Sequence, residues 1–126
     1  MGKRILVIDD DNEFLEELQE LLILSGYEVT AVNDSIAALD IAKLSIPDLI
    51  LVDIKMNGLN GFQVADRLNQ FGETAGVPVI AMSGYFKEDE HLALMQQLGI
   101  KALIRKPFSP LDVIWRIENF IKENKG

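Results

Sequence analysis

Apolar residues follow two kinds of pattern that alternate along the chain. Short continuous apolar runs predict strands, and apolar residues that recur every three or four positions predict helices. The predicted strands are Lys3–Ile8, Tyr27–Val32, Leu49–Val52, Val77–Met82 and Ala102–Arg105. The predicted helices are a segment from Phe14 to Leu22 that ends before Gly26, then Ser35–Leu44, Gly61 to about Phe71, Phe86–Leu98 and a helix that begins after Ser109.

The last helix has the clearest start signal. Ser109 has the chemistry of an N-cap, Pro110 takes the first helical position, and Asp112 follows the cap by three residues. The apolar face of this helix is formed by Ile114, Ile117 and Ile121. Trp115 is offset from that face, so it either packs at the margin of the sheet or lies in an interface.

Five apolar strands alternating with five helices predict an α/β three-layer sandwich, with a parallel sheet covered by helices on both faces. Right-handed crossovers leave few topologies for such a chain. In the flavodoxin-like order 2-1-3-4-5, strand order reverses between the first and third strands, and ligands bind there, beyond the carboxyl ends of the strands. The length of 126 residues predicts one domain, residues 1–126.

Acidic residues stand at this switch point. Asp9 and Asp10 follow the first predicted strand, and Asp53 follows the third. Two unit charges about 4 Å apart repel by roughly 4 kcal/mol at an effective dielectric constant near 20, so a bound cation is needed to hold the carboxylates together. Because all the ligands are oxygen atoms, the pattern predicts a Mg²⁺ site.

The ends of the fourth and fifth strands add two more functional groups. The stretch "IAMSG" brings the hydroxyl of Ser83, and "LIRKP" brings the ammonium group of Lys106, followed by Pro107. A carboxylate nucleophile, a metal, a hydroxyl and an ammonium group at one edge of a sheet are the components needed to hold a phosphoryl group.

Composition and charge narrow the possible partners. The formal net charge is −8 and no Lys/Arg cluster exceeds a pair, so no direct binding to nucleic acid is expected. Cysteine is absent, which excludes disulfides and thiolate sites. No run approaches the roughly 18 apolar residues of a membrane span, and no signal peptide precedes the first strand. We therefore expect a cytoplasmic protein without a membrane association.

Four stretches together carry a resemblance to a known family. "ILVIDDD", "LILVDIKM" with Gly61 eight residues past Asp53, "VIAMSG" and "LIRKPF" occur in this order and spacing. They resemble the receiver (CheY-like) domain of two-component response regulators, over essentially the whole chain. The resemblance implies a CheY-like fold and a signalling role: not an enzyme, but a phosphoacceptor domain that assists its own phosphorylation and dephosphorylation.

The resemblance also implies residue roles. Asp53 would accept a phosphoryl group from a sensor histidine kinase or a histidine phosphotransfer protein, Lys106 would pair with the phosphoryl oxygens, and Ser83 would hydrogen-bond to the bound group. The implied Mg²⁺ ligands are Asp10, Asp53, the backbone carbonyl of Lys55 and, through water, Asp9. A downstream protein would bind the face made by the fourth helix, the fifth strand and the fifth helix.

The chain departs from the family pattern in three places. Asn57 replaces the usual proline four residues after the phosphoacceptor, which predicts a less rigid loop. Leu103 replaces the usual aromatic residue three positions before Lys106, so aromatic coupling between site and surface is not expected. Lys55 and Tyr85 flank the predicted pocket, where their bulk would slow the attack of water on an acyl phosphate.

Other interpretations remain open. The D-x-D spacing of Asp9 and Asp11 also occurs in aspartate-nucleophile phosphohydrolases, although Ser83 and Gly84 stand where that class needs further catalytic elements. A flavin-binding module or a receiver that no longer accepts phosphate is a third possibility. Two further residues have ordinary structural interpretations. Asp11 is expected to cap the first helix. His91 has no second His or Cys with which to bind a metal, so its side chain is expected to be solvated.

The chain ends soon after the last predicted helix, which favours a stand-alone response regulator that acts by binding a partner or by passing its phosphoryl group along a relay. The alternative is a receiver excised from a larger response regulator or a hybrid histidine kinase.

Overall fold

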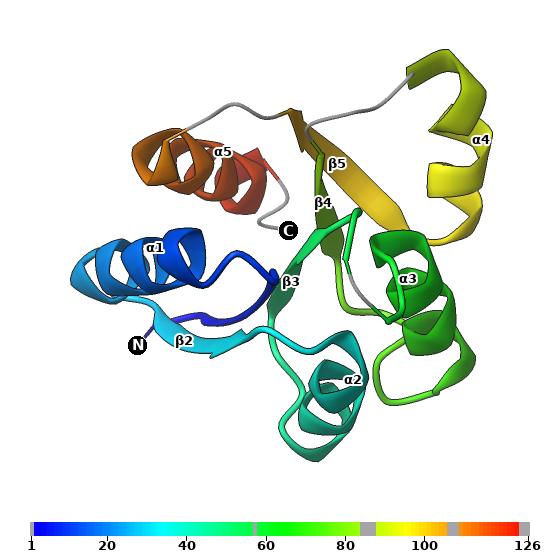
Figure 1. Cartoon of the computed structure of the whole chain (residues 1–126), viewed down its shortest axis with the longest axis horizontal. Helices are drawn as coiled ribbons and strands as arrows, with labels where there is room; N and C mark the ends of the chain where they lie inside the picture. The colour runs from blue at the N-terminus through cyan, green and yellow to red at the C-terminus, as the bar shows by residue number, and fades with distance from the viewer. Residues whose placement is uncertain (1, 57, 84–87, 106–108, 124–126) are drawn as a thin grey trace.

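The computed structural model describes residues 2–56, 58–83, 88–105 and 109–123, and within 88–92 it describes the backbone alone. Strands and helices alternate strictly along the chain (Figure 1). The strands are β1 (Arg4–Ile8), β2 (Glu28–Val32), β3 (Leu49–Asp53), β4 (Val79–Ser83) and β5 (Ile100–Arg105). The helices are α1 (Asn12–Leu24), α2 (Ser35–Leu44), α3 (Gly61–Gln70), α4 (Glu88–Gln97) and α5 (Pro110–Glu123).

The strands form one parallel sheet in the order β2-β1-β3-β4-β5, which confirms the predicted topology. At its centre Ile8 pairs with Val52, so β1 and β3 end side by side. One strand further, Asp53 pairs with Met82 of β4. The acidic residues after β1 and at the end of β3 therefore share one edge of the sheet.

Helices cover both faces of the sheet, as Figure 1 shows: α1 and α5 lie on one face, and α2, α3 and α4 on the other. Successive strand residues point to opposite faces. On β1, Leu6 and Ile8 pack towards α2 and α3, whereas Ile5 and Val7 pack towards α1 and α5. Because both of their faces are buried, the three central strands are apolar over Ile5–Ile8, Leu49–Val52 and Val79–Met82, whereas the edge strand β2 carries the exposed Glu28 and Thr30.

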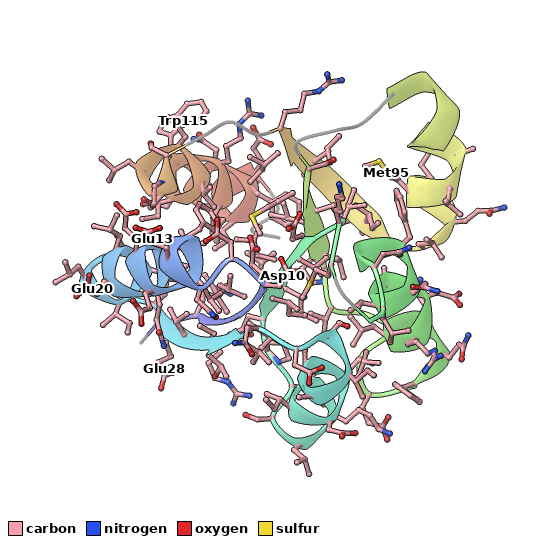
Figure 2. All side chains as sticks on the ribbon, viewed as in Figure 1. Asp10, Glu13, Glu20, Glu28, Met95 and Trp115 are labelled. Carbon is pink, nitrogen blue, oxygen red and sulfur yellow. The ribbon has the colours of Figure 1, made fainter. Side chains whose placement is uncertain are left out.

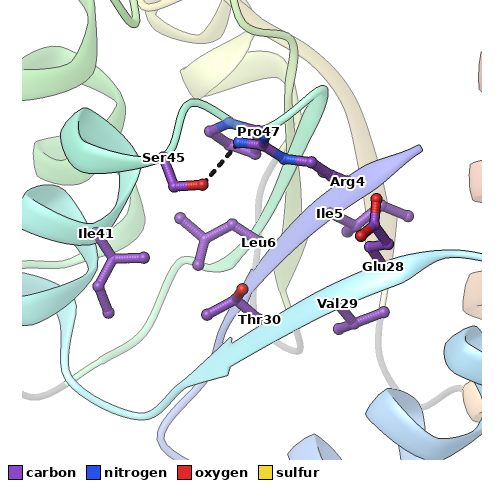
Figure 3. A pocket seen from close by; sticks show the side chains of 9 residues that line it. All are labelled: Arg4, Ile5, Leu6, Glu28, Val29, Thr30, Ile41, Ser45 and Pro47. Atoms are coloured by element: carbon purple, nitrogen blue, oxygen red, sulfur yellow. Dashed lines mark hydrogen bonds between the residues drawn. The ribbon is translucent and has the colours of Figure 1, made fainter. Parts of the chain in front are cut away.

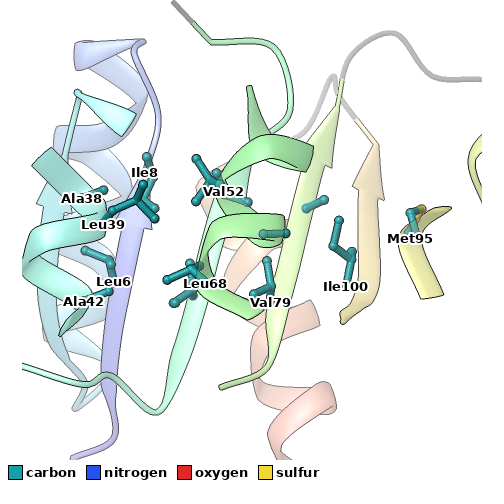
Figure 4. Close-up of a cluster of buried hydrophobic side chains, with 14 residues drawn as sticks. Leu6, Ile8, Ala38, Leu39, Ala42, Val52, Leu68, Val79, Met95 and Ile100 are labelled. Carbon is teal, nitrogen blue, oxygen red and sulfur yellow. The ribbon is translucent and has the colours of Figure 1, made fainter. Parts of the chain in front are cut away.

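Figure 4 shows the core on the α2, α3 and α4 side, where Leu68 of α3 and Met95 of α4 approach the strands. Both side chains are buried, at 2% and 6% exposure. Burying a side chain of this size contributes roughly 1.5–3 kcal/mol. Packing on this face therefore fixes the helices that follow β3 and β4, the strands that end at Asp53 and Ser83.

β1 and β2 each begin one residue later than the pattern predicts, and β4 and β5 also begin at other residues. β4 begins at Val79 instead of Val77, because Val77 donates its N–H to Thr74 in the preceding turn. β5 begins at Ile100 instead of Ala102. The register between β4 and β5 shifts by one residue after Val79, so the exposed Lys101 is an extra residue that interrupts the apolar run.

Two helix starts follow the predicted caps. Asp11 is the N-cap of α1 and accepts a hydrogen bond from the Phe14 N–H at 3.2 Å. Ser109 and Asp112 exchange hydrogen bonds at the start of α5, with the Ser109 N–H donating to Asp112 at 3.1 Å. For α4, the predicted first residue Phe86 lies outside the described residues. In the described part of the chain, none of the helices combines the length and the apolar character that crossing a membrane requires.

Candidate functional site

Three aspartates meet at the carboxyl edge of the sheet. One carboxylate oxygen from each of Asp9, Asp10 and Asp53 lies within 4.8 Å of the others. Asp9 is fully buried and Asp53 is 5% exposed, whereas Asp10 is half-buried. Figure 2 shows Asp10 near the middle of the molecule, beyond the end of β1. The structure thus brings together the three carboxylates that the strand ends predicted.

The backbone fixes the first of these carboxylates. The Asp9 N–H donates to the Val32 carbonyl of β2 at 3.1 Å, which continues the ladder past the end of β1. The Asp9 Oδ1 atom then accepts a hydrogen bond from the Asp11 N–H at 3.0 Å. Asp9 therefore directly follows β1, and its side chain holds the turn that leads to the N-cap of α1.

This donor set fits a hard divalent cation. Magnesium prefers oxygen ligands, keeps several of its waters and binds through one or two carboxylates, which leaves room for a phosphate group. Carboxylates this close together repel unless a positive charge lies among them. The cluster is thus consistent with Mg²⁺ binding.

Ser83 ends β4, the strand next to β3, and is 4% exposed. It stands one residue beyond Met82, the partner of Asp53 in the sheet. Lys55 is exposed, two residues after Asp53. The predicted site residue Lys106 lies outside the described residues, as do Asn57, Tyr85 and the side chain of His91.

The loop that follows Asp53 is tied down from several sides. The Ile54 N–H donates to the Met82 carbonyl at 2.9 Å, and the Gly61 N–H donates to the Ile54 carbonyl at 2.8 Å. Asn60 then caps α3 in a capping box with Gln63. These bonds set the path of the chain from the acidic edge into α3.

A further polar contact reaches this loop from α2. The Leu59 N–H donates to the Ser35 Oγ atom at 3.0 Å, and Ser35 is 1% exposed. The sequence pattern does not single out Ser35, because a serine after Asp34 at a predicted helix start looks like part of a cap. The contact spans 24 residues and has no periodic signature.

The structure shows the environment of two further residues singled out in the sequence. Leu103 is partly buried and packs against the core on the α2, α3 and α4 side. Trp115 is 66% exposed on α5 and, as Figure 2 shows, points away from the sheet, so packing at the sheet margin is wrong and a role in an interface stays a prediction.

A hollow of about 340 Å³ lies at the opposite end of the sheet (Figure 3). It is lined by the first residues of β1 and β2, by Ile41 of α2 and by the segment after α2. Arg4 donates a hydrogen bond across it to Ser45 Oγ at 2.7 Å. Since Arg4 begins the strand that ends at Ile8, this hollow is separate from the acidic edge.

Comparison with known proteins identifies the family. The family model of the response regulator receiver domain matches residues 5–118. The polar-differentiation response regulator DivK of Brucella anthropi is 32% identical over 122 residues, which cover 96% of this chain and 98% of DivK. The alkaline phosphatase synthesis transcriptional regulatory protein PhoP of Bacillus subtilis is 33% identical over 126 residues; the chain spans about half of its length, 51%.

Solved structures show the same fold. A CheY-like response regulator receiver domain protein from Methanospirillum hungatei superposes with a TM-score of 0.87 at 27% identity, covering 99% of this chain and 98% of that one. The chemotaxis protein CheY4 of Vibrio cholerae has a TM-score of 0.86 at 20% identity, covering 94% of this chain and 98% of that one. By its family match and its relatives, the chain belongs to the response regulator receiver domains of two-component systems.

Proposed function

We propose that Asp53 is the phosphoacceptor of a signalling switch and that its phosphorylation requires Mg²⁺. The observation that carries the proposal is the meeting of Asp9, Asp10 and Asp53 within 4.8 Å, at the carboxyl ends of adjacent strands, in a chain of the receiver family. Asp53 is the last residue of its strand and is held by pairing to Met82, so its carboxylate is presented at the edge in a fixed direction.

The donor is a phosphohistidine of a sensor histidine kinase or a histidine phosphotransfer protein. A carboxylate oxygen of Asp53 forms a bond to phosphorus while the bond from phosphorus to the histidine nitrogen breaks. The imidazole retains that electron pair, and because its other ring nitrogen carries a proton, it leaves as a neutral ring. The product is an acyl phosphate on Asp53 and a neutral histidine. The low exposure of Asp53 restricts the access of competing water.

The cation would be held by Asp10, Asp53 and the backbone carbonyl of Lys55, with Asp9 acting through water. When bound, Mg²⁺ neutralises charge on the carboxylates and on the phosphoryl oxygens. Asp9 suits the indirect role because its Oδ1 atom already accepts a hydrogen bond from the Asp11 N–H.

Ser83 and Lys106 respond to the new charge. A phosphoryl group adds negative charge and acceptor oxygens, which the Ser83 hydroxyl and the Lys106 ammonium group satisfy. Ser83 ends β4 and belongs to the same edge as Asp53, so its hydrogen bond to the phosphoryl group would draw in the segment that leads to α4. The altered surface of α4, β5 and α5 then controls the binding of a partner protein or onward transfer of the phosphoryl group.

In this proposal the protein is cytoplasmic and does not itself bind nucleic acid. Its net charge of −8 opposes a phosphate backbone. The chain covers nearly all of DivK but about half of PhoP, so a stand-alone regulator and a receiver taken from a larger regulator both match relatives of this chain.

Incubation with phosphoramidate and Mg²⁺, followed by intact-mass measurement, tests the proposal. The wild type should gain one phosphoryl group, and both Asp53→Asn and chelation of Mg²⁺ should abolish the gain. Asp40→Asn is the matched control, because Asp40 is an exposed acid on α2 outside the cluster. A wild type that stays unmodified, or an Asp53→Asn variant that is still modified, would contradict the proposal.

The same preparation tests the phosphohydrolase alternative. Sustained release of phosphate from a generic phosphate monoester, at many turnovers per molecule, would favour an enzyme. We expect at most one phosphoryl group per chain, and no such turnover.

A further inference from the structure

We propose that Ser35 is a positioning residue for the phosphorylation site. Its hydroxyl, at the start of α2, holds the loop after Asp53 in the geometry that Mg²⁺ binding and phosphoryl transfer need. This inference rests on the proposed function, because the loop includes Lys55, whose backbone carbonyl is a proposed metal ligand.

The contact is specific and sheltered. The Ser35 Oγ atom accepts a hydrogen bond from the Leu59 N–H at 3.0 Å, and Ser35 is 1% exposed although it is polar. A buried hydroxyl is costly unless it is hydrogen-bonded, so this one is held in place. It therefore acts as a fixed acceptor for one particular N–H of the loop.

Ser35 itself sits on a rigid support. Asp34 caps α2 and accepts hydrogen bonds from the Ile36 and Ala37 N–H groups at 2.9 and 3.3 Å. Ala38, one turn further, is fully buried in the core. The serine is thus held by its own helix, and the loop is the part that must adjust to it.

The backbone of the loop is shaped around this hydroxyl. Gly58 has a φ of +80°, and a Cβ atom added there would lie 3.3 Å from Ser35 Oγ. The loop thus approaches the serine closely at Gly58 and donates to it from the next residue. Hydrogen bonds between described residues tie the loop to other elements at both ends: Ile54 donates to Met82 at its start, and Leu59 donates to Ser35 near its end.

The hydrogen bond between Leu59 and Ser35 has a particular role in this chain. At position 57 the chain has Asn57 in place of the family's usual proline, which would restrict the backbone before folding. The apolar contacts of Ile54, Met56 and Leu59 with the core hold the loop down but do not orient its peptide groups. A hydrogen bond to a fixed acceptor does orient them, and supporting bonds of this kind tune a metal site through its ligands.

The test compares two variants that each remove one buried hydroxyl. Ser35→Ala removes the acceptor of the Leu59 N–H. Thr74→Val is the matched control, because Thr74 is also 1% exposed and donates from Oγ1 to the Leu68 carbonyl at 2.7 Å, at the other end of α3. Ser35→Thr retains an oxygen and serves as the rescue variant.

Two readouts do not depend on phosphorylation: amide hydrogen exchange at Leu59 without metal, and the dissociation constant for Mg²⁺ alone from titration followed by amide NMR. In Ser35→Ala we expect Leu59 exchange to rise about 10-fold, with Gly61 unchanged, and the dissociation constant for Mg²⁺ to rise roughly 10-fold. Thr74→Val and Ser35→Thr should keep both values within about 3-fold of the wild type.

Three results would overturn the inference. The first is an unprotected Leu59 amide in the wild type, which needs no variant to measure. The second is an unchanged Mg²⁺ affinity in Ser35→Ala, and the third is an equal loss of Mg²⁺ affinity in Thr74→Val. If the wild type binds Mg²⁺ but takes no phosphoryl group from phosphoramidate, the proposed function fails while these measurements still decide the role of Ser35. A wild type that binds no Mg²⁺ would overturn both.

Discussion

Gly61 lies directly against the backbone of Asp53. A Cβ atom at position 61 would stand 2.9 Å from the Asp53 carbonyl oxygen and 2.8 Å from the Ile54 Cα atom. These distances are shorter than real side chains tolerate, and backbone atoms at a strand end cannot move aside easily. The first residue of α3 is thus pressed onto the end of β3, and the acidic edge depends on a residue without a side chain.

Gly61→Ala should therefore destabilise the protein although alanine favours helices. We expect a loss of about 2 kcal/mol in the free energy of unfolding, the usual cost of overpacking, measured by urea denaturation. Gly72→Ala is the control, because a Cβ at Gly72 meets nothing within 4 Å. The control should change stability by less than about 0.5 kcal/mol. Equal effects of the two substitutions would show that the close approach is not what matters.

The acidic edge could be predicted from the sequence because the signals that mark it are local and periodic. Apolar runs that end at Asp9 and Asp53 mark strand ends, and the topology of a parallel α/β sheet then makes these ends neighbours. The positions of Ser83 and of the Asp11 cap follow in the same way. Thus the fold and the gathering of the three carboxylates at one edge can be predicted without coordinates.

Contacts between segments that lie far apart in the sequence could not be predicted in this way. The hydrogen bond from Leu59 to Ser35, and the one from Asn33 to Asn12 at 2.9 Å, join residues whose separation obeys no period. The bulge at Lys101 shifts the register of β5, so the pattern of alternation fails where that strand begins. Such features depend on the packing of whole elements, which a pattern of apolar positions does not encode.

The repulsion among the three carboxylates predicts that removing one of them stabilises the metal-free protein. Asp53→Asn without Mg²⁺ should raise the free energy of unfolding by about 1–2 kcal/mol, and high salt should reduce the gain. Asp40→Asn, which removes one exposed charge outside the cluster, should have a much smaller effect. Urea denaturation in a chelating buffer measures both. A destabilised Asp53→Asn would contradict the prediction.

Magnesium should reverse the order of stability, so that the wild type becomes more stable than Asp53→Asn. A ligand that binds only the folded state stabilises it by about 2.7 kcal/mol at a free concentration 100 times its dissociation constant. The wild type and Asp40→Asn should gain this stability, and Asp53→Asn should gain much less. The unfolding midpoint, followed across a Mg²⁺ titration at constant ionic strength, gives the comparison, and equal gains in all three proteins would place the ion elsewhere.

Trp115 should be open to solvent and contribute little to stability. It is the single tryptophan of the chain and is 66% exposed, whereas its neighbour Ile114 is 5% exposed. Trp115→Ala should change the free energy of unfolding by less than about 0.5 kcal/mol, and Ile114→Ala should cost about 2–5 kcal/mol. Acrylamide should quench the tryptophan fluorescence of the native protein almost as well as that of the unfolded chain. Strong shielding would mean that Trp115 is covered in solution.

Tyr27 should make the protein less stable at alkaline pH. Burial, and secondly the Glu118 carboxylate, raise the pKa of this phenol above its usual value of 10.0. The folded state therefore holds the proton more tightly than the unfolded state. The corresponding stability is complete below the unfolded pKa, near 10, and is lost as pH rises through the folded pKa.

Tyr27→Phe separates this effect from general alkaline unfolding, because it removes the ionisable group. Between pH of about 9 and pH of about 11, the wild type should lose more free energy of unfolding than Tyr27→Phe. Tyrosinate absorbance in a Tyr85→Phe background, where Tyr27 is the remaining tyrosine, reports the pKa directly. Glu118→Gln should lower that pKa by part of the shift, since burial is the larger cause. If Glu118→Gln leaves the pKa unchanged, the carboxylate does not act on Tyr27 in solution, and burial alone holds the proton.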